Sequence, residues 1–218
     1  MHVLVMAKEP APGKAKTRLC PPCSPAEAAT VAEAALVDSL RAVVDCKADR
    51  RVLAIAGRPG AWLPDGFEVI DQRGVDFGDR LANAWADAGG PGFQIGMDTP
   101  QISAGMLDAA LDQLAAGRSA VIGRALDGGW WGIGFQEPPA GAFEGVQMSC
   151  GDTADQQVAR LDSLGLSVAE LPRLRDVDTW DDALVVASEA PGSRFAAAVR
   201  SIGSIGSIGS PSMGSSLR

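Results

Sequence analysis

The chain has 218 residues, of which 46% are hydrophobic, and a formal net charge of −8. This length suits one α/β domain with a sizeable core. The overall negative charge argues against a nucleic-acid surface, which needs a broad basic face. Because no apolar stretch is long enough for a membrane span or a signal-peptide core, we expect a cytoplasmic protein.

The beginning of the chain combines a predicted strand with a basic loop. Residues 1–20 carry a local charge of +3, which leaves −11 for the remainder. The apolar run His2–Met6 predicts a buried parallel strand. The loop 7–19 follows it and contains two prolines, one glycine and all four cations of residues 1–20, namely Lys8, Lys14, Lys16 and Arg18. This local charge is typical of a site for a small anionic ligand.

The basic loop does not follow the known phosphate-binding patterns. The Walker pattern needs a glycine where Lys8 stands and a hydroxyl residue where Ala15 stands, and no Rossmann glycine fingerprint is present. A loop after a strand can nevertheless direct backbone N–H groups and cationic side chains towards a phosphate. The alternative interpretation is a basic loop exposed to solvent.

The next stretch predicts scaffold elements. Ser24 and Glu27 form a capping box, with proline at the first helical position, and an apolar stripe continues the helix to Val44. The segments Arg51–Ala56 and Phe67–Ile70 predict the second and third strands.

Polar residues then connect the third strand to a helix expected over Asp79–Ala88. In α/β sheets such connections carry binding residues. Gln72, Asp76 and Arg80 are therefore candidates for ligand contacts. Helix capping and surface pairing are the alternatives.

Asp98 is the central candidate of the sequence. The run Phe93–Met97 predicts a central strand, and Pro100 stops it because proline has no N–H for a neighbouring strand. Asp98 then lies at the carboxyl end, where open α/β sheets bind ligands. We predict a metal or substrate anchor, against the alternative of an aspartate that only caps a turn. Ser103 caps the following helix, predicted over residues 103–115.

A glycine-rich segment follows the next predicted strand, Ser119–Gly123. Four glycines lie among the nine residues from Asp127 to Phe135. They allow the backbone to approach another group closely, and we expect a core to gain little from so many. The adjacent Trp130 and Trp131 either pack on both faces of a strand or form a wall of an acceptor pocket.

An acidic cluster follows a helix predicted over Thr153–Leu164 and a strand predicted over Val168–Leu171. Asp181 and Asp182 fit the capping of the last predicted helix. Asp176 and Asp178 precede that helix, so one of them is expected to face the same crevice as Asp98. Carboxylates that converge on a phosphate would repel it without a divalent cation, which favours Mg²⁺ or Mn²⁺.

The sequence thus predicts one domain over residues 1–200, with a nucleotide-binding half at about 1–100 and an acceptor half at about 101–200. Residues 201–218 repeat Gly and Ser and cannot bury a core by themselves. We expect them to form a flexible tail.

Four motifs in this order resemble a known group of proteins: Lys16-Thr-Arg-Leu19, Gly96-Met-Asp98-Thr-Pro100, Asp127-Gly-Gly129 with its aromatics, and Asp176-Val-Asp178-Thr. The chain resembles the bacterial GT-A-fold transferases described as selenodomain- or arsenosugar-associated glycosyltransferases, over about residues 2–190. The segment Ala15–Leu19 is also similar to the 2-phospho-lactate guanylyltransferases, which share that fold.

The resemblance implies a three-layer α/β/α, Rossmann-like GT-A fold with a mostly parallel central sheet. It also implies a bound nucleotide or nucleotide sugar, a divalent metal and a small-molecule acceptor. The expected catalytic residues are Asp98, Asp127 and Lys16, and the expected metal ligands are Asp98 and Asp178, with Asp176 as the alternative second ligand. The expected nucleotide-binding residues are Lys8, Gly13, Lys16, Thr17, Arg18, Gln72 and Arg80, and the expected acceptor-binding residues are Gly128, Gly129, Trp130 and Trp131.

Three functions fit this pattern. The first is a metal-dependent glycosyltransferase that uses a nucleotide-sugar donor. The second is a nucleotidyltransferase that activates a small phosphorylated acceptor and releases pyrophosphate. The third is a nucleotide-binding protein without turnover.

Overall fold

The computed structural model describes residues 1–206. Within these residues, one sheet contains the strands β1 (His2–Lys8), β2 (Arg50–Ala56), β3 (Glu68–Asp71), β4 (Gly92–Ile95), β5 (Ala120–Ala125), β6 (Trp130–Phe135) and β7 (Val168–Leu174). The helices are η1, a 3-10 helix (Thr17–Leu19), α1 (Pro25–Asp45), α2 (Phe77–Ala88), α3 (Ala104–Ala115), α4 (Thr153–Ser163), α5 (Trp180–Glu189) and α6 (Arg194–Gly206).

The order of the strands in the sheet is β3-β2-β1-β4-β6-β5-β7. Strand β6 is antiparallel to both of its neighbours, and every other neighbouring pair in this sheet is parallel. Strand β4 is therefore central, as predicted, although it ends at Ile95, two residues before the predicted Met97. All strands except β6 direct their carboxyl ends to the same edge of the sheet.

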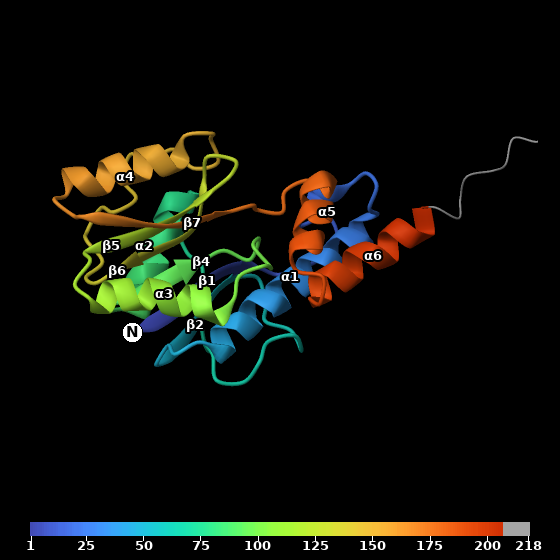
Figure 1. The fold of residues 1–218 in the computed structure, drawn as a ribbon, viewed down its shortest axis with the longest axis horizontal. Coiled ribbons are helices and arrows are strands. Elements are labelled where there is room, and N and C mark those ends of the chain that lie inside the picture. Colours follow the sequence, from blue (N-terminus) through green and yellow to red (C-terminus); the bar gives the residue numbers. More distant parts are fainter. Residues whose placement is uncertain (207–218) are drawn as a thin grey trace, which may run out of the picture.

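Helices cover both faces of the sheet (Figure 1). On one face α1 and α3 bury residues such as Leu36 and Leu111, and on the other α2 and α4 bury residues such as Trp85 and Leu161. Each buried side chain of this size stabilises the fold by about 1.5–3 kcal/mol. This arrangement confirms the predicted three-layer α/β/α fold with a mostly parallel sheet.

Capping side chains fix where the helices begin. The Ser24 side chain accepts a hydrogen bond from the Glu27 N–H, and Glu27 completes the capping box. Ser103 caps α3 in the predicted way. Helix α2 begins at Phe77, two residues before the predicted Asp79, because Asp76 accepts the Asp79 N–H at 2.8 Å and so caps an extra half turn. None of the helices within residues 1–206 is long and apolar enough to cross a membrane.

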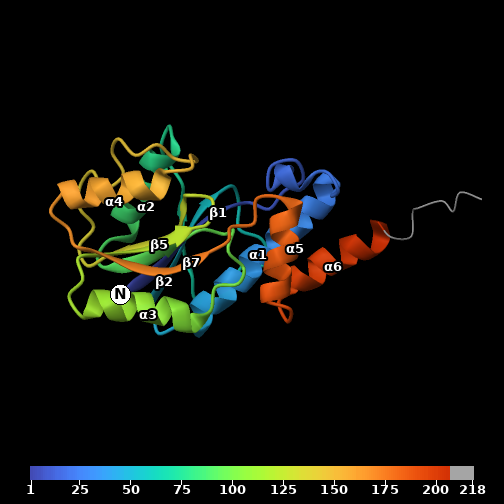
Figure 2. The ribbon, with the colours of Figure 1, turned by 45° about the horizontal axis from the view of Figure 1, so that its top comes forward.

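A third group of buried residues lies beyond the sheet, where the first half of α1 meets α5 and α6 (Figure 2). We call this group the helical cluster; among its members are Leu19, Val31, Val177, Val186 and Phe195. Helix α6 packs along α1, and the Asp38 carboxylate of α1 accepts hydrogen bonds from the first N–H groups of α6.

The predicted start of the tail at residue 201 is wrong, because α6 continues through Gly206. Phe195, Val199 and Ile202 are spaced by four and then three residues, so they lie on one face of the helix. Ile202 is half-buried and packs against the helical cluster. The rest of the predicted tail, 207–218, lies outside the described residues.

Truncation distinguishes the two parts of this segment. Removing residues 201–218 deletes the half-buried Ile202, so we expect the free energy of unfolding to fall by about 1 kcal/mol. Removing only residues 207–218 keeps α6 and is the matched control. Urea unfolding of both truncated proteins measures the difference, and equal stability would contradict the packing of Ile202.

Candidate functional site

The site lies where the strand order reverses. The chain adds β2 and β3 on one side of β1 and then returns to place β4 on the other side. Loops that leave neighbouring parallel strands in opposite directions open a crevice at this point, which is where such sheets bind ligands. The loop after β1 contains Lys16, and the loop after β4 contains Asp98. The predicted position of Asp98 at the carboxyl edge is therefore correct.

Lys16 connects these loops with the loop after β7. Its backbone is left-handed, with φ of 50° and ψ of 40°. Its Nζ lies 2.8 Å from Asp98 Oδ1 and 3.4 Å from Asp178 Oδ1, and it also donates to the carbonyl oxygen of Val177. One ammonium group therefore holds together three loops that are far apart in the sequence.

The positive charge of Lys16 and the negative charges of Asp98 and Asp178 stabilise one another. The Lys16 side chain is 10% exposed, whereas those of Asp98 and Asp178 are 40% exposed. Burial acts to lower the pKa of Lys16, but the charges of Asp98 and Asp178 outweigh it and raise that pKa above its ordinary value. Lys16 is thus charged at neutral pH. Arg18 donates to the other oxygen of Asp178 at 3.2 Å.

Asp176 is the most perturbed carboxyl group of the site. Its Oδ1 is buried and has no hydrogen-bond partner among the described residues. Burial, followed by the charges of Asp98 and Asp127, raises the pKa of Asp176 to about 7, although Lys16 acts in the opposite direction. Near neutral pH this side chain is therefore ready to take up a proton or a cation.

The pKa of Asp176 predicts how stability depends on pH without metal. The unfolded aspartate titrates near about 3.9, so between that value and about 7 the folded state binds the proton more strongly. The contribution of this group to stability therefore falls as the pH rises through this range, and it stays low above it.

Asp176→Asn removes this titration. We expect the variant to be more stable than the wild type at pH 8 by on the order of 1–3 kcal/mol, and to match it near pH 4. Urea unfolding in EDTA at several pH values measures the difference. The same pH dependence in both proteins would contradict the raised pKa.

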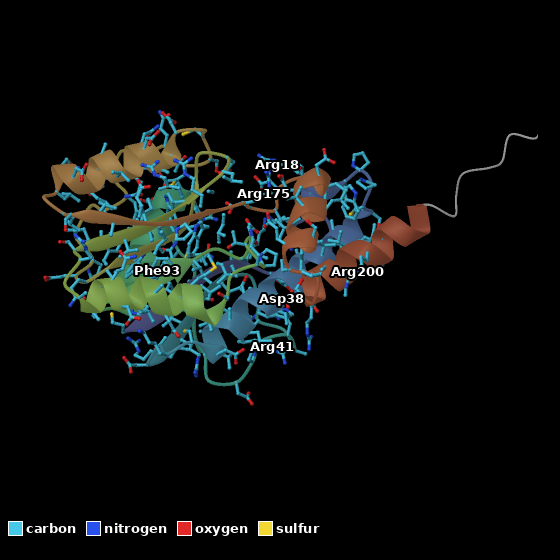
Figure 3. The ribbon with its side chains drawn as sticks, viewed as in Figure 1. Arg18, Asp38, Arg41, Phe93, Arg175 and Arg200 are labelled. Carbon is cyan, nitrogen blue, oxygen red and sulfur yellow. The ribbon has the colours of Figure 1, made fainter. Side chains whose placement is uncertain are left out.

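A cavity of about 500 Å³ opens beside these residues. Three cationic side chains border it, those of Lys8, Arg18 and Arg80. Four carboxylates border it as well, those of Asp98, Asp127, Asp176 and Asp178. A neighbouring cavity of about 240 Å³ lies over the basic loop and is bordered by Lys14, Lys16 and Thr17, among others. Arg18, which donates to Asp178 in the loop before α5, lies apart from Phe93 in the sheet (Figure 3). An anion can therefore approach several cations from the solvent.

The structure gathers most of the predicted nucleotide-binding residues. Lys8, Arg18, Gln72 and Arg80 border the 500 Å³ cavity, and Lys16 and Thr17 border the adjoining one. Gln72 has a structural role as well, because its amide nitrogen donates to the carbonyl oxygens of Ala7 and Ala54, at 2.8 and 2.9 Å. Gly13 is exposed at φ of 72° in the basic loop and borders neither cavity.

The glycines from Asp127 to Phe135 make room mainly for the protein itself. A Cβ at Gly132 or Gly134 would lie 2.4 or 2.7 Å from the ring of Phe93, and one at Gly128 would lie 1.8 Å from the carbonyl oxygen of Gly151. The expectation that a core gains little from these glycines is therefore wrong. Gly129 donates its N–H to Asp127 Oδ1 at 2.8 Å, which closes the turn before β6.

The two tryptophans lie in different environments. Trp131 is 2% exposed and donates from Nε1 to the carbonyl oxygen of Pro172 at 3.0 Å. Trp130 is half-buried, and its ring stacks on Phe143 with centroids 6.4 Å apart. The Nε1 of Trp130 is buried without a partner among the described residues. Both tryptophans border the cavity, and Trp130 has the polar atom that a ligand can satisfy.

Several residues of the cavity wall were not predicted. Thr99 is 1% exposed, and its Oγ1 has no partner within residues 1–206. Phe77, Met148, Ser149 and Cys150 also border the cavity. The segment around Met148 has no periodic pattern, so the sequence offered no signal that it returns to the sheet edge. Thr99 directly follows Asp98 at the carboxyl end of the strand, and this position could have indicated that Thr99 borders the site.

Solved structures resemble this arrangement. A protein from Desulfovibrio desulfuricans G20, provisionally described as a nucleotide-diphospho-sugar transferase, matches 94% of this chain with 95% of its own at 26% identity and a TM-score of 0.83. A cytidylyltransferase from Leptospira borgpetersenii matches over 94% of each chain at 16% identity and a TM-score of 0.53. The 2-C-methyl-D-erythritol 4-phosphate cytidylyltransferase of Thermus thermophilus matches 88% of this chain and 100% of its own, at 16% identity and a TM-score of 0.53. This protein has the nucleotide-diphospho-sugar transferase fold.

The family follows from the sequence match. Residues 30–150 match a family described as an uncharacterized protein conserved in bacteria, DUF2064. The match spans more than half of the chain, so the chain belongs to this family. No protein of curated function matches it. Asp98 and Asp127 lie inside the matched range, whereas Lys16 and Asp178 lie outside it and join them through the fold.

Proposed function

We propose that this protein transfers a glycosyl group from a nucleotide-sugar donor to a small acceptor, with the help of a divalent metal. The observation that carries this proposal is the Lys16 ammonium held between the carboxylates of Asp98 and Asp178 at the edge of the cavity. Such a site combines cations for a diphosphate with oxygen ligands for a metal. The similar protein from D. desulfuricans, provisionally described as a nucleotide-diphospho-sugar transferase, gives further support.

The nucleotide would bind in the 500 Å³ cavity and over the basic loop. Lys8, Lys16 and Arg18 would meet the phosphates, and Gly13 and Thr17 would let the loop follow them closely. Arg80 and Gln72, which border the same cavity, would contact the rest of the nucleotide. Arg80 has no ion pair among the described residues, so its charge is available to the ligand.

The residues present fit Mg²⁺ or Mn²⁺. Within residues 1–206 no three His, Cys, Asp or Glu side chains form a complete metal site. Mg²⁺, however, usually takes one or two carboxylates and completes its shell with phosphates and water. Asp98 and Asp178 would hold the ion, with Asp176 as the alternative second ligand because its Oδ1 lacks a partner. The bound ion would offset the negative charge of the departing diphosphate.

The acceptor would enter from the side of β6. In the reaction, a hydroxyl oxygen of the acceptor bonds to the anomeric carbon of the sugar, and the bond from that carbon to the phosphate oxygen breaks. Asp127 would take the hydroxyl proton through Oδ2, because its Oδ1 accepts the N–H of Gly129. Gly128, Gly129, Trp130 and Trp131 would form the nearby wall, and the Nε1 of Trp130 would donate to the acceptor.

A nucleotidyltransferase is the second candidate, favoured by the cytidylyltransferase fold of two similar structures. An acceptor phosphate would attack the α-phosphorus of a nucleoside triphosphate, and pyrophosphate would leave. A nucleotide-binding protein without turnover is the third.

Product analysis separates these functions. The protein is incubated with nucleotide sugars or with nucleoside triphosphates, each with and without Mn²⁺. Release of nucleoside diphosphate from a nucleotide sugar is the expected result, and pyrophosphate would favour the second function. Thermal shift with the same ligands reports binding, because a ligand of the folded state raises the melting temperature. Binding without either product would favour the third function.

A further inference from the structure

A larger cleft, of about 990 Å³, lies next to the nucleotide cavity. The beginning of α2 forms one wall, and the segment 141–150 forms the other. Phe77, Met148 and Cys150 border both the cleft and the 500 Å³ cavity. The two spaces therefore adjoin at these residues, and the proposed reaction needs a second binding place next to the donor.

The cleft differs from the cavity in charge. Its wall contains the carboxylates of Asp76, Asp79 and Glu144, and none of its lining residues is Lys or Arg. Arg160 of α4 is not among the lining residues, but it donates to the Gly141 carbonyl oxygen and offsets part of the charge of Glu144 through an ion pair at 3.2 Å. A phosphate in this cleft would meet acidic groups without a lining cation to offset them.

The beginning of α2 does not make the cleft favourable for a phosphate. A helix start attracts anions through its free N–H groups. Here Asp76 accepts the N–H of Asp79, and Asp79 accepts the N–H of Val75 at 3.2 Å. The two carboxylates thus offset the positive end of the helix, and each has a second oxygen outside these bonds.

An exposed aromatic ring lies at the junction of the two spaces. Phe77 is 45% exposed, although most large apolar side chains of the described residues are buried. An aromatic face of this kind stacks on the apolar face of a ring compound and attracts a nearby cation. Phe77 thus provides a surface on which a ring can lie beside the donor.

We propose that this cleft binds the acceptor, and that the acceptor is a hydroxyl-bearing ring compound without a phosphate, preferably one with a positive charge. The proposal rests on the proposed function and narrows its acceptor class. It extends the proposed acceptor site from the wall near β6 towards α2, and the ring of Phe143, which lines the cleft, stacks on Trp130 of that wall.

Saturation-transfer NMR tests the proposal without nucleotide and without turnover, so it is independent of whether transfer occurs. Three probes of the same ring size are compared at millimolar concentration: glucosamine, glucose and glucose 6-phosphate. We expect binding in the order glucosamine, glucose, glucose 6-phosphate. Failure of all three to bind, or equal or stronger binding of the phosphate, would overturn the proposal.

Substitutions in the cleft test whether its residues cause the preference for glucosamine over glucose 6-phosphate. The double variant Asp76→Asn/Glu144→Gln keeps hydrogen-bonding groups of the same size, and asparagine caps a helix nearly as well as aspartate. The preference for glucosamine over glucose 6-phosphate should fall roughly tenfold, or about threefold for each exposed carboxylate. Phe77→Ala should weaken the binding of all three probes. The control Glu33→Gln/Asp65→Asn removes two exposed carboxylates outside the cleft and should keep the preference. An unchanged preference in Asp76→Asn/Glu144→Gln would refute the site.

Discussion

Asp98→Asn is expected to lower turnover by roughly 10²-fold or more while the protein remains folded. The substitution keeps the size of the side chain and removes the negative charge that faces the Lys16 ammonium at 2.8 Å. Asp178 still pairs with Lys16, which limits the loss of stability. The metal would lose an anionic ligand, and the departing diphosphate would lose the cation that offsets its charge.

Three measurements test this expectation: the rate of nucleoside diphosphate release, the Mn²⁺-dependent nucleotide affinity and the melting temperature. Asp178→Asn is the companion variant and should weaken metal-dependent binding as well. Asp181→Asn is the control, because Asp181 is an exposed aspartate in the first turn of α5. A folded Asp98→Asn protein with normal turnover and normal Mn²⁺-dependent binding would show that Asp98 has no role in metal binding or catalysis.

Lys16→Met is expected to impair both turnover and folding. Methionine keeps the length of the apolar stem but removes the only cation that contacts both Asp98 and Asp178 among the described residues. These two carboxylates and Asp176 would then repel one another with less compensation. We expect the free energy of unfolding to fall by about 1–3 kcal/mol, the scale of hydrogen bonds to charged groups, and turnover to fall by roughly 10²-fold.

Urea unfolding and product release measure the two effects. Lys14→Met is the matched control, since Lys14 is exposed in the same loop and should leave stability unchanged. Added Mn²⁺ should restore part of the stability of Lys16→Met, because a divalent ion can replace the missing charge between the carboxylates. If Lys16→Met and Lys14→Met were equally stable, the contacts of Lys16 with the three loops would have no energetic role.

Local signals were sufficient for much of the fold. Ser24 and Ser103 mark helix starts through bonds within three residues, and Pro100 marks the irregular segment after β4, which ends at Ile95. The carboxyl edge at Asp98 followed from these signals together with the parallel order of the strands. The order of the strands in the sheet, with β6 antiparallel to β4, could not be predicted from the sequence.

Contacts between distant residues were the part that the sequence could not provide. Lys16 and Asp178 are 162 positions apart, and the left-handed backbone of Lys16 has no sequence signal of the kind that glycine gives. The glycines from Asp127 to Phe135 were expected to contribute little to a core, because Phe93, which packs against Gly132 and Gly134, lies on another strand. In the same way, a Gly- and Ser-rich segment predicts a tail until the partner face for Ile202 is known.

The helical cluster connects the two sides of the site. Leu19 ends the basic loop, Val177 lies between Asp176 and Asp178, and both side chains are buried in this cluster. The spacing between the Lys16 ammonium and the acidic loop is therefore set by the packing of α1, α5 and α6, outside the cavity itself. A change in side-chain volume at residue 19 would shift one loop against the other unless residue 177 changed to compensate. In an alignment of this family, we expect residue sizes at positions 19 and 177 to covary.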